Sequence, residues 1–152
     1  MYNFVLRIAI YVRNETWKLL DAITLGVRVI AVKDNKVLLV RHTYKMNWHL
    51  PGGGVKRKET FVEAAIRELY EEARAKVKQL NLVDVYTNFA EGRNDHMILF
   101  SGNIVSLESV KTREVAEIGF FDSNHLPHDT DPQCRVRIQE FFRSRLSFAE
   151  EQ

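Results

Sequence analysis

The chain has 152 residues, of which 45% are hydrophobic and 28% are charged, a balance typical of a globular domain rather than a disordered segment. This length predicts one compact domain with a real core and leaves little room for a second domain. The net charge of +2 is too small to indicate nucleic acid as the main ligand. The only cysteine, Cys134, excludes an internal disulfide and any zinc site based on Cys/His spacing, and it favours a reducing, cytoplasmic setting.

The first residues form an amphipathic lead-in. We expect residues 1–22 to be a segment, helical over 1–20, that packs on the domain formed by residues 23–152. The positions expected to face inward are Phe4, Ile8, Val12 and Trp17. The apolar stretch from Met1 to Val12 is too short to span a bilayer, so we expect no membrane partner.

Two β-branched segments, Thr24 to Val32 and Lys36 to Arg41, predict a β-hairpin, because Asp34-Asn35 between them is a turn signal. A short strand at Trp48 is then ended by Pro51. Further strands are predicted for residues 79–90 and 95–105 and for Glu114 to Phe121.

Two helices are predicted. Thr60 and Glu63 match a capping box that begins the first, whose expected apolar face comprises Val62, Ala65, Ile66, Leu69 and Ala73. Asp131-Pro132 is an N-cap and first-turn pair for the second, whose expected inward residues are Cys134, Ile138, Phe141 and Phe142. The order of strands, helix, strands and helix predicts an α/β fold with helices on the faces of a mixed sheet.

The strongest chemical signal is a group of glutamates near the end of the first helix. Glu71 and Glu72 follow Glu68 by three and four residues, so all three share one arc of the helix surface. Their mutual repulsion and the negative end of the helix dipole both act against them. A hard divalent cation such as Mg²⁺ or Mn²⁺ would offset both effects, whereas the simpler alternative is an acidic, solvated helix face.

The glycine run before this helix, Gly52 to Gly54, adds to the signal because glycines let backbone groups approach phosphates or metals closely. If the chain reverses between the glycines and the last helical turn, both would line one cleft. Cations held there would neutralise a diphosphate and position a water for attack on phosphorus, and a carboxylate would take the proton of that water.

These residues resemble the Nudix box. Gly53 is followed after five residues by Glu59 and after seven more by Arg67-Glu68-Leu69-Tyr70-Glu71-Glu72, with Ala73, Arg74 and Ala75 completing its 23 positions. The flanking stretches VLLVRH, LPGGG and EVAEIGFFDSNHLP are also similar to Nudix proteins, and the resemblance covers residues from about 23 to 148. It implies the Nudix fold, an α/β/α sandwich around a mixed β-sheet, and hydrolysis of a diphosphate linkage in a nucleoside-diphosphate-linked substrate.

The resemblance also implies roles for individual residues. Glu71 and Glu72 would bind Mg²⁺ (or Mn²⁺), Glu68 would be a ligand or the general base, and the carbonyl of Gly52 would complete the ligand set. Glu59 and Arg67 would form a structural pair that ties the loop to the helix. A further acid from a later loop is expected at Glu114, with Glu117 as its rival.

Two positions depart from the usual pattern. Arg74 stands where the box has a glycine that suits a left-handed helix end, so we expect it to cost about 1 kcal/mol if that turn is kept. Lys58 stands where relatives often have glycine, and it either strains the loop or attracts phosphate.

Four residues are candidates for substrate binding. Arg41 and His42, at the end of a strand, would direct positive charge at a phosphate, Trp48 would stack on a base, and Gly53 would bring its backbone near the phosphates. For Arg41 and His42 the alternative is an exposed strand end, and for Trp48 it is a place in the core.

Three functions remain open at this stage: the hydrolase, a non-catalytic Nudix-like domain that senses a nucleotide, and an interaction domain with an acidic helix. The partner in the first two is a small nucleotide-like molecule, and the oligomeric state is open. Because no additional N-terminal domain precedes the box, the ADP-ribose-hydrolysing members that dimerise by swapping are disfavoured.

Overall fold

The computed structural model describes residues 22–89, 94–108 and 114–150, with the backbone alone for 146–150, and near the N-terminus Val5, Ile8, Ala9, Tyr11, Val12, Glu15 and Thr16. Those seven residues are helical, as predicted. Ile8 and Val12 are 48% and 53% exposed, so the expectation that they face inward is wrong. Phe4 and Trp17 lie outside the described residues, and the packing of residues 1–22 on the domain stays a prediction. Within the described ranges, no helix combines the length and apolar character needed to cross a membrane.

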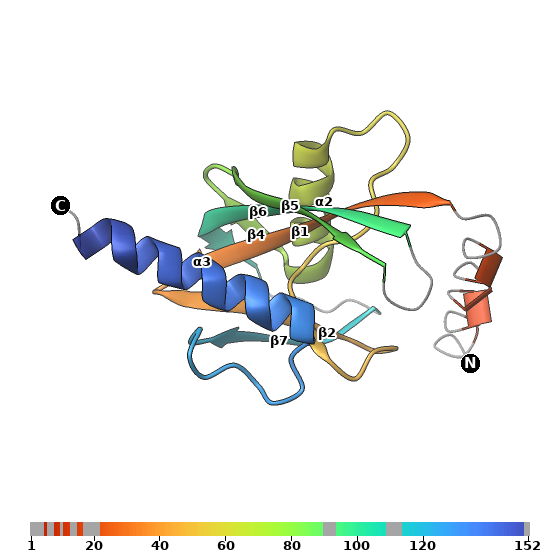
Figure 1. Ribbon diagram of the computed structural model, residues 1–152. Coiled ribbons are helices and arrows are strands. Elements are labelled where there is room, and N and C mark those ends of the chain that lie inside the picture. Colours follow the sequence, from red (N-terminus) through yellow and green to blue (C-terminus); the bar gives the residue numbers. More distant parts are fainter. Residues whose placement is uncertain are drawn as a thin grey trace.

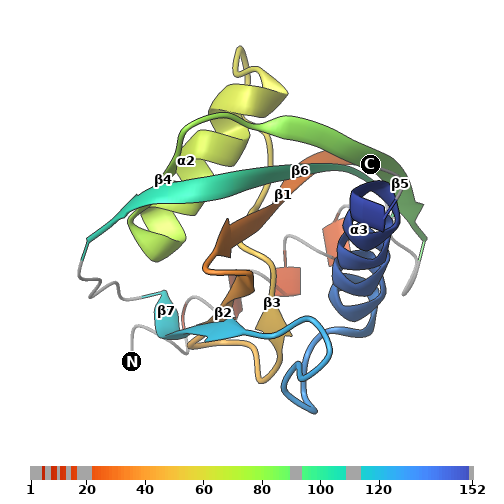
Figure 2. The ribbon, with the colours of Figure 1, turned by 90° about the vertical axis from the view of Figure 1, so that its left-hand side faces the viewer.

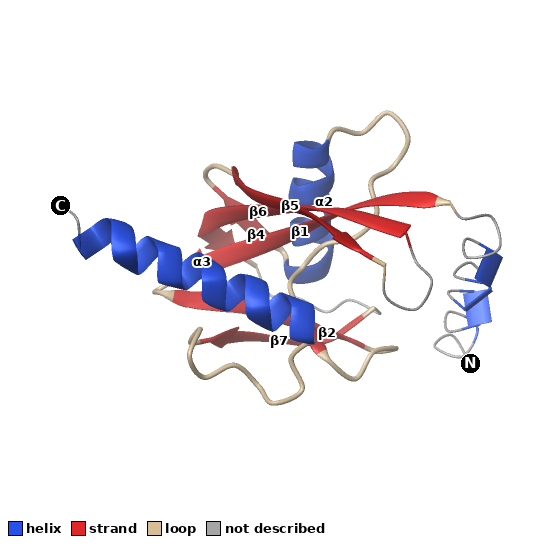
Figure 3. Ribbon diagram, in the orientation of Figure 1, coloured by secondary structure: helices blue, strands red, loops and turns tan. Residues whose placement is uncertain are grey.

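Over the described ranges of the domain the chain forms seven strands and two long helices (Figures 1 and 3). The strands are β1 (Ile23–Lys33), β2 (Lys36–His42), β3 (Trp48–His49), β4 (Ala75–Val77), β5 (Asn81–Asn88), β6 (Asn94–Leu107) and β7 (Val115–Phe121). The helices are α2 (Phe61–Ala73) and α3 (Pro132–Glu150). Every predicted strand is confirmed, and β4 was missed because three residues are too few for a periodic signal.

The central strand β1 pairs with two other strands, β6 and β2. It runs parallel to β6 along most of its length, and it pairs with β2 in antiparallel fashion only next to their turn, at Val32–Val37 and Lys33–Lys36. The turn residues Asp34 and Asn35 have φ values of 49° and 61°, the left-handed conformation that matches the twist of a two-residue hairpin. Beyond these pairs β1 and β2 separate, while β2 pairs with β3 and β7.

The segment Pro51–Val55, which contains the three glycines, is hydrogen-bonded to β1 where β2 has left it. The backbone N–H of Val27 donates to the Gly53 carbonyl and that of Val29 to the Pro51 carbonyl, each at 2.9 Å. Because these bonds follow a strand ladder, the glycine segment is fixed against the centre of the sheet rather than free as a surface loop.

A separate core lies on each face of the sheet, with α2 covering one face and α3 the other (Figure 2). Alternate residues of β1 divide between them, since Val27, Val29 and Ala31 pack under α2 whereas Ile30 and Val32 pack under α3. This arrangement confirms the predicted α/β/α sandwich. The inward residues of α3 are also confirmed, because Cys134, Ile138 and Phe142 are buried and Phe141 packs against the same cluster.

The buried face of α2 is rotated from the predicted one. Thr60 caps the helix as expected, and its hydroxyl and the Glu63 side chain form the reciprocal capping box. Val62 and Ile66 are 45% and 51% exposed, however, and Ala64 is buried together with Ala65, Leu69 and Ala73. Ala65, Leu69 and Ala73 of the predicted face are thus confirmed, and the buried face is shifted toward Ala64, away from Val62 and Ile66. As a consequence, Glu68 and Glu72 come to the border of the core.

Candidate functional site

The glycine corner, which we define as Gly52 and Gly53, requires glycine at Gly52, whereas at Gly53 glycine leaves room for a side chain of the helix. Gly52 has a φ of +146°, and a Cβ there would lie 2.1 Å from the Val27 carbonyl oxygen. A Cβ on Gly53 would lie 2.6 Å from Oε1 of Glu68. The first glycine therefore lets the chain approach β1, and the second lets a helix carboxylate approach the chain.

Glu72 lies against this corner. Its Oε2 accepts a hydrogen bond from the backbone N–H of Gly52 at 2.9 Å, and its Oε1 lies 3.1 Å from Nε2 of His42. The Glu72 side chain is only 12% exposed, so it is not part of a solvated acidic face. Both of its oxygens are held by groups outside its own helix.

Arg67 contacts the other acidic groups near the corner. Its guanidinium binds Glu59 through two hydrogen bonds of 2.6 and 2.9 Å, and it contacts Glu68 at 2.5 Å and Glu71 at 3.2 Å. It also donates to the Gly54 carbonyl at 3.0 Å. The contact between Glu59 and Arg67, expected from the sequence, is therefore present and connects the loop before α2 to the glycine segment.

The glutamates differ in their electrostatics. The hydrogen bonds from Arg67 and from the backbone N–H of Lys56 lower the pKa of Glu59 to about 2. Burial raises the pKa of Glu68, and the neighbouring charges of Glu72 and Glu71 add to this effect while Arg67 opposes it. The α2 carboxylates thus crowd one another, which is the unfavourable condition that the sequence indicated.

The Gly52 carbonyl, expected from the resemblance to bind a cation, accepts a hydrogen bond from the Arg28 guanidinium of β1. A positive charge already lies at this oxygen. The structure therefore brings Glu68 and Glu72 together at the corner, and a cation at the second lone pair of this carbonyl would meet repulsion from the Arg28 charge.

The three side chains expected to bind substrate are engaged elsewhere. Arg41 pairs with Glu117 at 3.2 Å and with Asp129 at 2.6 Å, and its guanidinium covers the Trp48 ring at 4.7 Å. Trp48 is 6% exposed and belongs to the core under α3, so the expectation that it stacks on a base is corrected in favour of its core role. His42 is buried and its Nε2 faces Glu72, so in this structure its contact is with a helix carboxylate, and its expected role toward phosphate stays a prediction.

The candidate late acids, Glu114 and Glu117, have other partners than the glutamates of α2. Glu114 is exposed just before β7, and its carbonyl accepts a hydrogen bond from the Thr43 N–H at 2.9 Å. Glu117 pairs in register with Arg41 and forms its ion pair on the α3 face of the sheet. Among the contacts of the described residues, neither carboxylate touches Glu68, Glu71 or Glu72.

Both departures from the usual box adopt left-handed backbone. Arg74 caps α2 with a φ of 50°, and its N–H donates to the Tyr70 carbonyl at 2.9 Å. Lys58 has a φ of 62° in the turn before α2. The left-handed turns are kept without glycine at both positions, and the cost in stability stays a prediction.

One cluster was not found in the sequence. His49 of β3, Asp131 just before α3 and Cys134 of α3 bring their ligand atoms within 4.8 Å of one another, although His49 and Cys134 are 85 positions apart in the sequence. Burial and the charges of Lys45 and Arg28 lower the pKa of His49 to about 4. Those two positive charges also act against a cation at this place, so the neutral imidazole is the main property of the cluster.

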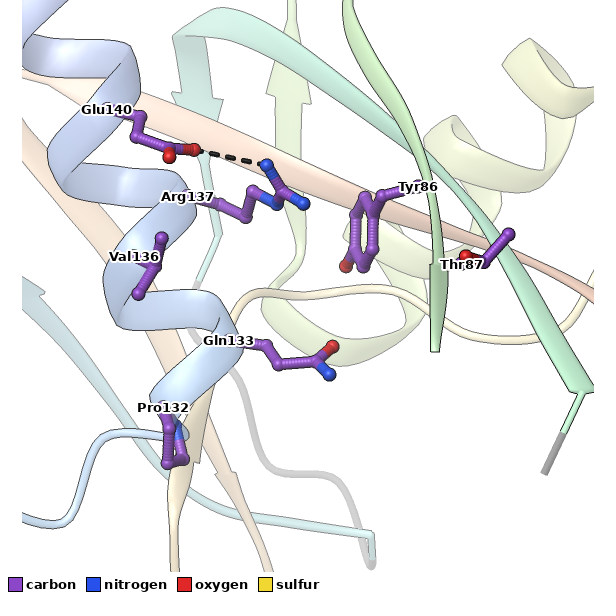
Figure 4. A pocket seen from close by; sticks show the side chains of 7 residues that line it. All are labelled: Tyr86, Thr87, Pro132, Gln133, Val136, Arg137 and Glu140. Carbon is purple, nitrogen blue, oxygen red and sulfur yellow. Dashed lines mark hydrogen bonds and ion pairs between the residues drawn. The ribbon is translucent and has the colours of Figure 1, made fainter. Parts of the chain in front are cut away.

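A cavity of about 360 Å³ lies between β5 and α3 (Figure 4). Arg137 crosses it from α3, covers the Tyr86 ring at 4.7 Å, and pairs with Asp84 and Glu140, each at 3.1 Å. Gln133 also points into the space. Because the charged groups of its lining already satisfy one another, the cavity by itself indicates no particular ligand.

Comparisons with known proteins agree with this geometry. Two curated relatives match the chain over 103 residues, 64% of this chain and 61% of each relative: ADP-ribose pyrophosphatase of Methanocaldococcus jannaschii, 35% identical, and a probable DHNTP pyrophosphohydrolase of Lactococcus lactis subsp. cremoris, 29% identical. The match thus spans about three fifths of the length of these relatives.

The fold is that of a solved structure, the MutT NUDIX hydrolase from Burkholderia pseudomallei. The TM-score is 0.69 at 22% identity, covering 78% of this chain and 97% of that one. A family model described as the NUDIX domain matches residues 22–141, which include the glycine corner, all of α2 and the start of α3. The chain therefore belongs to the NUDIX family.

Proposed function

We propose that this chain is a Mg²⁺- or Mn²⁺-dependent Nudix pyrophosphohydrolase that cleaves a diphosphate linkage in a nucleoside-diphosphate-linked substrate. The observation that carries the proposal is the position of Glu68 and Glu72, two poorly exposed carboxylates that flank the glycine corner. Repulsion between buried carboxylates is unfavourable unless a cation or a specific function offsets it.

The donor set suits a hard divalent cation. Glu68, Glu71 and Glu72 offer carboxylate oxygens, the ligands that Mg²⁺ and Mn²⁺ prefer. Glu71 is 52% exposed and is contacted only by Arg67 and Lys56 among the ion pairs of the described residues, so it is free to reorient. The fit of the Gly52 carbonyl is weaker, since Arg28 occupies it. When bound, the cation would neutralise the diphosphate and lower the pKa of a water.

In this proposal each residue of the site has its own role. Glu71 and Glu72 hold the cation, and Glu68 is either a further ligand or the group that accepts a proton from the attacking water. Glu59 and Arg67 fix the loop against α2 and keep Glu68 at Gly53. The Gly53 backbone is the proposed contact to the phosphates, and Glu114 is retained as the proposed late acid.

The names of the two relatives suggest candidate substrates for this chain. ADP-ribose and DHNTP, taken from the names of the two relatives, join nucleoside triphosphates and nucleotide sugars in the panel to be tested. The match to an ADP-ribose pyrophosphatase keeps ADP-ribose among them, although the sequence alone disfavoured that class. We further propose a reducing, cytoplasmic setting, which the single buried cysteine supports.

The test is a chromatographic assay of the purified chain with this panel, which separates each intact compound from its phosphomonoester or pyrophosphate products, in Mg²⁺, in Mn²⁺ and in excess EDTA. We expect turnover of at least one diphosphate-containing compound with either metal and none in EDTA. The Glu72→Gln variant should lose this activity, and Glu140→Gln, a change of the same chemistry at an exposed site on α3, should keep it.

The rival function is a nucleotide sensor without catalysis. It predicts saturable nucleotide binding with no turnover of any compound in the panel. An interaction domain with an acidic helix predicts instead that Glu72→Gln changes neither metal nor nucleotide binding. Either result would overturn the hydrolase proposal.

A further inference from the structure

His42 is the last residue of β2, and the alternation of the strand determines where its side chain goes. Leu38 and Val40 pack under α2, whereas Leu39 packs under α3. His42 continues the first series, so its ring points at α2 and its Nε2 lies 3.1 Å from Oε1 of Glu72. The strand thus carries this imidazole to a carboxylate that the chain brings from 30 residues further on.

Apart from Glu72, the described residues give the His42 ring nitrogens no hydrogen-bond partner. The His42 side chain is 8% exposed, and its Nδ1 is a buried atom without a hydrogen-bond partner among the described residues. Tyr44 stacks on the ring, with centroids 5.1 Å apart and planes 24° from parallel. A buried polar atom without a partner is unfavourable, so an apolar side chain would stabilise the core more than histidine does. The contact with Glu72 therefore explains why a histidine stands at this buried position.

The contacts of Glu72 define what this histidine does. Oε2 is bound by the Gly52 N–H at 2.9 Å and Oε1 by His42, so the plane of the carboxylate is set from both sides. Each carboxylate oxygen has two acceptor sites and therefore keeps one for a further partner. Glu71, by comparison, is 52% exposed, and its ion pairs within the described part of the chain are with the long, flexible side chains of Lys56 and Arg67.

We propose that His42 is a positioning residue: by donating from Nε2 to Oε1 it holds Glu72 in the one orientation in which this carboxylate meets a divalent cation at the glycine corner. The inference rests on the proposed function and assigns His42 to the metal site rather than to substrate phosphate. Groups that orient a metal-binding side chain typically contribute 10- to 100-fold to metal affinity or activity.

The experiment measures Mn²⁺ binding to the substrate-free protein by electron paramagnetic resonance, together with KM and kcat. His42→Leu removes the donor and fills the same space. His42→Gln keeps an N–H donor near the place of Nε2. His125→Leu is the matched control, because that histidine is 86% exposed in the loop after β7. Thermal unfolding in EDTA verifies that each variant is folded.

We expect His42→Leu to weaken Mn²⁺ binding by about 10-fold or more, with His42→Gln recovering most of the loss and His125→Leu matching wild type. In a Glu72→Gln background, His42→Leu should cause no further loss, because the histidine acts through that carboxylate. A purely structural role would instead change unfolding in EDTA and would not be rescued by glutamine.

Two results would overturn the inference while leaving the proposed function intact: His42→Leu binds Mn²⁺ as wild type does, or it raises only KM for the substrate, as loss of a phosphate contact would. Failure of the wild-type protein to bind Mn²⁺ would instead remove the metal site itself, and this inference with it.

Discussion

The neutral imidazole of His49 should make the stability of this protein depend on pH in a defined window. His49 is 12% exposed, and burial, followed by the charges of Lys45 and Arg28, lowers its pKa from 6.5 to about 4. Asp131, 4.0 Å away, acts in the opposite direction but does not compensate. Below pH 6.5 the unfolded chain therefore binds a proton at His49 that the folded chain binds only near pH 4.

Because the unfolded state holds more protons in this window, the free energy of unfolding falls as the pH is lowered from 6.5 to 4. Each unit of difference in pKa corresponds to about 1.4 kcal/mol, so the full effect is about 3 kcal/mol. Partial access of His49 to solvent reduces it, and we expect about 2–3 kcal/mol. Above pH 6.5 the imidazole is neutral in both states and the contribution is constant.

The assay is urea unfolding at a series of pH values between 7.5 and 4, for wild type, His49→Gln and the exposed control His125→Gln. Subtracting the curves removes the titration of the carboxylates, which all three proteins share. Between pH 6.5 and 4, the free energy of unfolding of wild type should fall by about 2–3 kcal/mol more than that of His49→Gln. A difference that stays flat with pH would refute the assignment of a neutral, buried His49.

The remaining predictions concern α2 and the loop before it. Glu72→Gln and Glu68→Gln should each lower kcat by about 100-fold or more with little change in urea unfolding, and turnover retained by either variant would remove that residue from its role. Glu59→Gln should loosen the preceding loop, seen as faster trypsin cleavage there, with a smaller loss of kcat; unchanged cleavage would contradict the tie to Arg67. Arg74→Gly should stabilise the protein by about 0.5–1 kcal/mol in urea unfolding, because glycine adopts the left-handed cap without strain, and a loss of stability would show that this strain is absent.

Local signals in the sequence were sufficient for most elements and for the identity of the acidic residues. The turn at Asp34-Asn35, the capping box of Thr60 and Glu63, and the N-cap at Asp131 each depend on residues a few positions apart, and all are present in the structure. The order of the glutamates along the Nudix box likewise requires only the spacing of one helix.

The positions of these groups relative to the rest of the chain could not be predicted in the same way. The sequence indicated that the glutamates share an arc of α2, but the sheet decides that Glu68 and Glu72 are poorly exposed while Glu71 remains half exposed. The apolar face was predicted correctly at Ala65, Leu69 and Ala73 and wrongly at Val62 and Ile66 for the same reason. Helical spacing allows two adjacent faces, and only packing against β1 and β6 selects one of them.

The sequence by itself determined the fold class, the helix that carries the carboxylates and the glycines on which the corner depends. The tertiary structure alone decided that β1 and β2 separate to admit Pro51–Val55, that Arg28 binds the Gly52 carbonyl, and that His42 faces Glu72. The physical reason is that caps and turns are satisfied by neighbours in the chain. A buried polar side chain, by contrast, takes its partner from whichever distant element the packing of the sheet places beside it.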